Sequence, residues 1–194
     1  MKSWIIGITG LIASGKSTAS HYIADRYNLH LIDADKIGHQ VLQDPKTIQA
    51  LASEFPSAYR AERKSMNREA LSDIVFHSDE KLLLLQSITW PYILNEVYHQ
   101  ISNHPKCVIE AIGLFQTNLY KKCNHTIYID CPIDIIKDRL QARGLPKDKI
   151  NGILLKQKTI QEKQQLASVC LKNNLSVNCL YSLLDQVMKN WRKV

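Results

Sequence analysis

Eight consecutive residues near the start of the chain, Gly10-Leu11-Ile12-Ala13-Ser14-Gly15-Lys16-Ser17, constrain the fold more than any other stretch. They fit the pattern G-x-x-x-x-G-K-[ST], the phosphate-binding loop (P-loop) that joins a buried strand to a helix. The flanking segments agree, because residues 4–9 form a short apolar run and residues 18–24 can continue as a helix. The pattern predicts a binding site for a nucleoside triphosphate. A chance match in a Gly/Ser-rich turn is the alternative.

The residue types of this loop suit phosphate binding. Glycines let the backbone turn tightly so that successive N–H groups converge on a phosphate, and the helix N-terminus adds partial positive charge. We expect Lys16 to reach the β- and γ-phosphates and to take part in catalysis, and the Ser17 hydroxyl to bind Mg²⁺. The residues expected to contact ATP are Leu11, Ile12, Ala13, Ser14, Gly15, Lys16, Ser17 and Thr18.

Composition narrows the class of protein. The 194 residues suffice for one domain with a real core, and the apolar fraction of 45% and charged fraction of 22% are ordinary for a globular protein. The net charge of +7 comes from scattered basic residues rather than a basic tract. A phosphate-rich small substrate explains this charge better than a nucleic acid does, and a solvated surface is the simplest alternative. We expect no nucleic-acid partner.

The five cysteines indicate free thiols in a reducing compartment, because their number is odd and no C-x-x-C pair occurs. The N-terminal residues lead directly into the first apolar run, so no signal peptide is expected. No apolar run approaches the roughly 20 residues of a membrane span. We therefore expect a cytoplasmic protein without a membrane partner, either a monomer or a weak homo-oligomer.

Short apolar runs alternate with helical patterns along most of the chain. Predicted strands cover residues 4–9, 29–35, 107–112, 125–130 and 168–172, and predicted helices cover 133–143, 148–166 and 177–191. This alternation favours an α/β fold with a parallel sheet flanked by helices. Residues 44–66 are predicted to be irregular. Residues 67–102 are predicted to be a helical subdomain, in which Pro91 should kink or divide a long helix.

Three carboxylates fall where predicted strands end. Asp33 and Asp35 end the strand over residues 29–35, and if the strand continues both side chains lie on one face. The alternative is that Asp35 caps a following helix. Because ligands bind beyond the carboxyl ends of parallel strands, both belong on the same side as the P-loop. Glu110 could support a bound metal ion or make a strand-edge hydrogen bond.

The order of these motifs resembles the dephospho-coenzyme A kinase family. The P-loop is shared by many kinases, but residues 32–35 (Ile-Asp-Ala-Asp) together with residues 66–76 (Met-Asn-Arg-Glu-Ala-Leu-Ser-Asp-Ile-Val-Phe) are much more specific. The resemblance covers nearly the whole chain and continues through Leu119, Tyr120, Lys121, Lys122, Arg139, Arg143, Gln157, Lys163 and Ala167. It implies transfer of the ATP γ-phosphoryl group to the ribose 3′-hydroxyl of dephospho-CoA.

The resemblance also implies a domain plan and roles for individual residues. It implies one P-loop kinase domain over residues 1–194, with a helical acceptor-binding insertion at about 60–103 and a short lid at about 139–150. Asp35 would accept or orient the acceptor proton. Asp33, Arg68 and Arg139 would contact substrate, and Arg143 would act in catalysis. Arg139 and Arg143 lie four apart on one predicted helix, so surface pairing with nearby aspartates is the alternative.

Three positions depart from the family pattern. Trp90 stands where a histidine is usual, Gln116 where a glutamate is usual, and Ser168 where an aspartate is usual. Two other functions therefore stay open. One is another small-molecule or nucleoside monophosphate kinase on the same fold. The other is a non-catalytic protein that binds nucleotide or CoA and has lost the acceptor site.

Overall fold

A five-stranded parallel sheet forms the centre of the larger of two units of the chain. The computed structural model describes residues 3–191, and within them two compact units are distinct, one made of residues up to 33 and from 103 onward, the other of residues 34–102. The sheet belongs to the first unit, and its strand order is β2-β5-β1-β6-β7. The strands are β1 (Trp4–Gly10), β2 (His30–Asp33), β5 (Lys106–Glu110), β6 (His125–Asp130) and β7 (Val169–Lys172).

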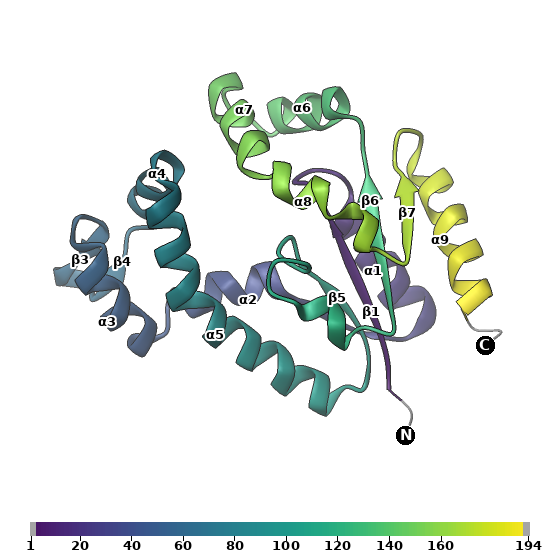
Figure 1. Ribbon diagram of the computed structural model, residues 1–194, viewed down its shortest axis with the longest axis horizontal. Coiled ribbons are helices and arrows are strands. Elements are labelled where there is room, and N and C mark those ends of the chain that lie inside the picture. Colours follow the sequence, from purple (N-terminus) through teal and green to yellow (C-terminus); the bar gives the residue numbers. More distant parts are fainter. Residues whose placement is uncertain (1–2, 192–194) are drawn as a thin grey trace. The chain divides into compact units, whose positions relative to one another are not determined.

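The central strand β1 is buried from Ile5 onward because it has a neighbour on each side and helices over its faces. Its apolar residues pack with α1 (Lys16–Tyr27) and α9 (Val177–Trp191), which lies beside β7 in Figure 1. The register pairs Ile8 with Glu110 and Gly10 with Ile129. The predicted α/β fold with a parallel sheet is confirmed.

Aromatic and polar contacts join α1 to α9. The rings of Tyr22 and Tyr181 stack with centroids 4.0 Å apart. The hydroxyls of Tyr27 and Tyr22 donate to the two carboxylate oxygens of Asp185, at 2.7 and 2.9 Å. These hydrogen bonds, that from Tyr27 first, hold the pKa of Asp185 below its usual value. The contacts orient the helix that follows the P-loop.

The remaining helices of the first unit follow β6. They are α6 (Ile133–Ala142), α7 (Lys147–Lys156), α8 (Lys158–Glu162) and the 3₁₀ turn η4 (Gln164–Leu166), with a second 3₁₀ turn, η3 (Leu119–Lys122), between β5 and β6. The single helix predicted over residues 148–166 is wrong, because the chain breaks at Gln157 and again at Lys163. The break at Gln157 coincides with a hydrogen bond that its side chain accepts from the backbone of the P-loop.

The second unit, residues 34–102, is mainly helical and has its own core. Its elements are α2 (Ala34–Val41), α3 (Pro45–Glu54), η1 (Pro56–Ala58), β3 (Tyr59–Arg60), η2 (Ala61–Arg63), β4 (Ser65–Met66), α4 (Arg68–His77) and α5 (Asp79–Asn103). Strands β3 and β4 form a small antiparallel hairpin. The buried core of this unit is Leu51, Phe55, Ala58, Met66 and Leu71.

The prediction that residues 44–66 are irregular is wrong. Asp44 caps α3, and its carboxylate accepts from the backbone N–H groups of Lys46 and Thr47 at 3.0 and 3.1 Å. Pro45 occupies the first helical position, where the missing N–H costs nothing. An Asp-Pro pair followed by a helical pattern is itself a helix-start signal. The polar composition of the segment obscured it.

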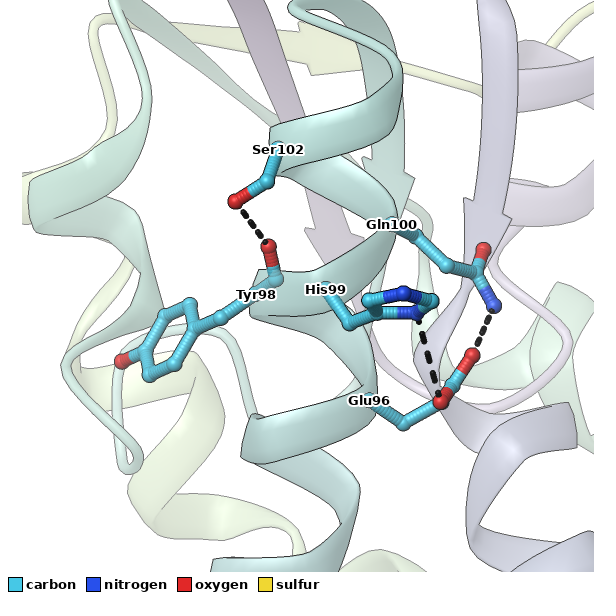
Figure 2. A network of polar contacts seen from close by, with 5 residues as sticks. All are labelled: Glu96, Tyr98, His99, Gln100 and Ser102. Atoms are coloured by element: carbon cyan, nitrogen blue, oxygen red, sulfur yellow. Dashed lines mark hydrogen bonds and ion pairs between the residues drawn. The ribbon is translucent and has the colours of Figure 1, made fainter.

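Helix α5 runs without a break through Pro91, so of the two predicted effects of this proline a division of the helix does not occur, and a kink stays a prediction. Pro91 and Ser87 are both exposed, which lets water satisfy the carbonyl that loses its intrahelical donor. Near the end of α5, Gln100 donates to Glu96 at 2.8 Å, His99 lies 3.9 Å from the same carboxylate, and the Ser102 hydroxyl donates to the Tyr98 carbonyl at 2.9 Å (Figure 2). Contacts between residues three and four apart support an exposed helical turn.

The strand predicted over residues 29–35 is shorter than expected. It ends at Asp33, and α2 begins at Ala34, so Asp35 lies in the first turn of a helix. The two carboxylates therefore do not share one face of a strand. A negative charge in a first helical turn is favourable because the helix N-terminus is positive.

Within residues 3–191, the helices are all too short or too polar to cross a bilayer.

All five cysteines are free, and their surroundings differ. Cys170 and Cys179 are exposed, whereas Cys107 and Cys131 are buried and Cys123 is half-buried. Burial raises the pKa of Cys107 to about 11 and that of Cys123 to about 12. Thiolate is the reactive species, so both thiols are chemically quiet near neutral pH.

We therefore expect a thiol reagent at pH 8 to modify Cys179 and Cys170 in the native protein well before the other three. Peptide mapping after timed labelling measures this order. A urea-unfolded sample is the control, because there all five should react. Rapid native labelling of Cys107 or Cys123 would contradict the packing of the sheet.

Candidate nucleotide-binding site

The loop between β1 and α1 turns sharply because two glycines adopt backbone conformations that other residues avoid. Gly10 has a φ of 151° and Gly15 a φ of 104°. A Cβ atom at Gly10 would lie 2.5 Å from the backbone oxygen of Ile129, so β6 leaves no room for a side chain there. At Gly15 a Cβ would collide with the amide nitrogen of Asn173. Both glycines of the motif are therefore required by neighbouring strands as well as by the turn.

Lys16 and Ser17 begin the helix that follows the loop. Lys16 is 7% exposed, and its Nζ donates to the carbonyl of Leu11 at 3.4 Å, so the ammonium group lies over the loop. Ser17 and Thr18 are exposed in the first turn of α1, where backbone N–H groups lack intrahelical partners. A buried lysine that lies over a loop at a helix N-terminus attracts a polyphosphate strongly, because the ammonium group and the helix N-terminus are both positive.

Glu110 is buried, with 3% of its surface exposed, and it lies against α1 at the end of β5. Its two carboxylate oxygens accept hydrogen bonds from the hydroxyls of Ser17 at 2.5 Å and Ser20 at 2.6 Å. The strand register places Asp33 of β2 opposite Glu110. Glu110 therefore makes hydrogen bonds from the end of its strand, and its predicted support of a metal ion stays a prediction.

The oxygen donors around Ser17 fit a magnesium ion. Mg²⁺ prefers hard oxygen ligands and usually keeps several waters, so one hydroxyl and one nearby carboxylate suffice when phosphates supply the rest. Among residues 3–191 no group of three or more His, Cys, Asp or Glu side chains could hold a metal ion by itself. The donor set around Ser17 therefore suits a metal ion whose remaining ligands come from phosphates and water.

Side chains from three distant elements contact the backbone of the loop. Gln157, at the junction of α7 and α8, accepts from the Ile12 N–H at 2.9 Å. Arg139 of α6 donates to the Ala13 carbonyl at 3.0 Å. Asn173, just after β7, donates to the Ser14 carbonyl at 2.7 Å. Gln157 and Asn173 were absent from the predicted site. Both stand in segments that resemble the family, but no residue pattern around either one indicates a contact with the loop.

Arg139 and Arg143 are not equivalent. Arg139 is half-buried, and besides its contact with Ala13 it lies 3.6 Å from the Cys131 sulfur. Burial raises the pKa of Cys131, and the guanidinium opposes that shift in part. Arg143 is exposed at the C-terminal end of α6, directly before Gly144, whose φ is 83°. The structure therefore brings Arg139, but not Arg143, into contact with the P-loop.

The other predicted site residues are divided between the two units. Asp33 ends β2 in the first unit, and Asp35 follows in α2. Arg68 is exposed at the start of α4, whose N-cap Asn67 accepts from the Glu69 N–H at 3.2 Å. Leu11, Ile12, Ala13, Ser14, Gly15, Lys16, Ser17 and Thr18 together form the loop and the first turn of α1.

Comparison with known proteins assigns this P-loop fold to a family. A sequence model described as dephospho-CoA kinase matches residues 4–178. The chain belongs to the dephospho-CoA kinase family. The dephospho-CoA kinase of Borrelia garinii subsp. bavariensis is 34% identical over 186 residues, which is 94% of this chain and 89% of that protein.

A second relative carries the same name, and a solved structure shares the fold. The dephospho-CoA kinase of Saccharomyces cerevisiae is 31% identical over 197 residues, which is 95% of this chain and 81% of that protein. The crystal structure of TT1252 from Thermus thermophilus superposes with a TM-score of 0.81 at 25% identity and 98% coverage of both chains. The family resemblance predicted from the motifs is confirmed.

The departures from the family pattern have different surroundings. The Ser168 hydroxyl accepts from the Thr126 N–H at 3.0 Å, and the Ser168 N–H donates to the Thr126 hydroxyl at 2.9 Å, so Ser168 joins β7 to β6. Gln116 has a buried Oε1 without a hydrogen-bond partner among the described residues. Trp90 is half-buried in α5. Ser168 therefore links two neighbouring strands of the sheet. The buried Oε1 of Gln116 is an acceptor atom that no described residue binds.

We expect Gly10→Ala to weaken MgATP binding at least about 10-fold and to lower stability by about 1–3 kcal/mol, because the added methyl forces the loop away from Ile129. Calorimetric titration and thermal unfolding measure the two effects. Gly113→Ala is the control, since its Cβ would meet nothing closer than 3.7 Å. Wild-type values for Gly10→Ala would show that the loop does not need this close approach.

Proposed function

We propose that this protein phosphorylates the ribose 3′-hydroxyl of dephospho-CoA with ATP, giving coenzyme A. The observation that carries the proposal is the buried Lys16 and the Ser17–Glu110 hydrogen bond within a P-loop, in a chain of the dephospho-CoA kinase family. Phosphoryl transfer depends on positioning and charge stabilisation more than on covalent help from the protein. A donor site of this kind supplies both.

On the donor side, the backbone N–H groups of residues 13–18 and the Lys16 ammonium would hold the ATP phosphates. The Ser17 hydroxyl would bind Mg²⁺, and Glu110 would hold that hydroxyl and a metal-bound water in place. When bound, Mg²⁺ would neutralise charge on the β- and γ-phosphates. The two serine hydroxyls that donate to Glu110 satisfy its buried carboxylate oxygens and fix the position of that side chain beside Ser17.

On the acceptor side, we assign Asp35 as the group that accepts or orients the proton of the attacking hydroxyl. Asp33 would assist through metal-bound water, and Arg68 would contact the acceptor nucleotide. Arg139 and Arg143, in the lid at about residues 139–150, would neutralise the charge of the phosphoryl group that is transferred. The helical insertion at about 60–103 would hold the acceptor. The cytoplasmic location and the weakly associating or monomeric state stay predictions.

The test is a coupled assay of ADP release by the pure protein with MgATP. Dephospho-CoA is compared with a panel of nucleosides, nucleoside monophosphates and shikimate as acceptors. Turnover with dephospho-CoA alone supports the proposal. Turnover with another acceptor instead favours a different small-molecule kinase, and tight ATP binding without any transfer favours a non-catalytic binding protein.

Asp35→Asn should reduce kcat by about 10²-fold or more, because the amide cannot accept the hydroxyl proton. The dissociation constant for MgATP should stay within about 2-fold, since the donor site is built from other residues. Glu54→Gln, which changes an exposed carboxylate of the same unit outside the proposed acceptor-binding insertion, is the matched control and should keep full activity. Unchanged turnover of Asp35→Asn would remove Asp35 from the mechanism.

A further inference from the structure

Ala13, in the middle of the P-loop, has an unusual backbone conformation. Its φ is 57°, in the left-handed region that residues with a Cβ rarely adopt. Such a conformation persists only where the surrounding structure holds it there. Ala13 lies between the two glycines of the loop, so its conformation decides where the following N–H groups point.

Three side chains bind the three consecutive residues centred on Ala13, one backbone group each. Gln157 binds the N–H of Ile12, Arg139 the carbonyl of Ala13, and Asn173 the carbonyl of Ser14. The partners lie 145, 126 and 159 residues away along the chain. Contacts this remote in sequence do not arise from the turn itself, so the loop geometry is imposed from outside.

Asn173 makes the most protected of these contacts. It is 6% exposed, and its hydrogen bond with the Ser14 carbonyl is buried. Its own N–H donates to the Asp130 carbonyl at 2.6 Å, which ties it to the end of β6. Its amide also occupies the space beside Gly15. A buried hydrogen bond between two fixed groups leaves the loop little freedom.

We propose that Gln157, Arg139 and Asn173 are positioning residues that hold Ala13 in its left-handed conformation and so keep the loop shaped for the nucleotide phosphates. The inference rests on the proposed function only in requiring that this loop binds ATP. Gln157 and Asn173 contact the loop backbone, so they act through the loop. Arg139 adds this role to the substrate contact predicted for it.

Gln157→Leu and Asn173→Leu test the proposal, because leucine keeps much of the side-chain volume and cannot form the hydrogen bond. Each should raise the dissociation constant for MgATP about 10-fold, which corresponds to about 1.4 kcal/mol. Gln161→Leu and Asn174→Leu are matched controls at exposed positions nearby, and should change it less than about 2-fold. Binding is measured by calorimetry without acceptor.

The decisive measurement combines Gln157→Leu with Ala13→Gly. Glycine adopts a positive φ at little cost, so the loss caused by Gln157→Leu should shrink to less than about 3-fold in the Ala13→Gly background. Equal losses of MgATP affinity in the two backgrounds would overturn the proposal, because they would mean that Gln157 supports binding in a way unrelated to the conformation of Ala13. A fall in melting temperature with unchanged affinity would overturn it as well.

If Asn173→Leu fails to fold, the double-mutant cycle of Gln157→Leu and Ala13→Gly still tests the proposal, because Gln157 is only half-buried. The outcome is also separable from the proposed function. A wild-type protein that binds MgATP but does not phosphorylate dephospho-CoA removes the proposed function and leaves the cycle valid. Turnover of dephospho-CoA without coupling between Ala13 and Gln157 removes only the positioning role. A wild-type protein that does not bind MgATP removes both.

Discussion

The shape of the P-loop depends first on strand β6, which runs directly against the first glycine of the loop. At Gly10 the backbone of β1 approaches the Ile129 carbonyl so closely that no side chain fits between them. The strand register pairs the same two residues. The turn therefore starts at a fixed point of the sheet, and each later residue of the loop is placed relative to that point. Lys16 and Ser17 reach their positions through this chain of constraints.

A second constraint is the buried charge of Glu110. A carboxylate with 3% exposure needs partners, because leaving an ionised group unsolvated in the interior is costly. The hydroxyls of Ser17 and Ser20 meet that need, since both lie on the side of α1 that faces β5. The same hydrogen bond fixes the Ser17 hydroxyl, which we propose as a ligand of Mg²⁺. One interaction thus serves both the packing of α1 and the chemistry of the site.

Several elements could be read from the sequence because their signals are local. The P-loop pattern, the helical segment predicted from residue 67 and the amphipathic helix ending at Trp191 are set by residues a few positions apart. The errors have local causes too. The Asp44-Pro45 start of α3 was hidden by polar surroundings, and the strand before Asp35 was extended by two residues. The break at Gln157 has no local signal, because its side chain bonds to Ile12 across the fold.

The sequence by itself determined the strand–loop–helix unit, the parallel α/β class and the family, because each rests on residue types in short, ordered motifs. Only the tertiary structure decided which residues hold the P-loop in place. Asn173, Gln157 and Arg139 come to the loop from elements more than a hundred residues away. The physical reason is that the order of strands in the sheet, which no local pattern encodes, brings the ends of β1, β6 and β7 together.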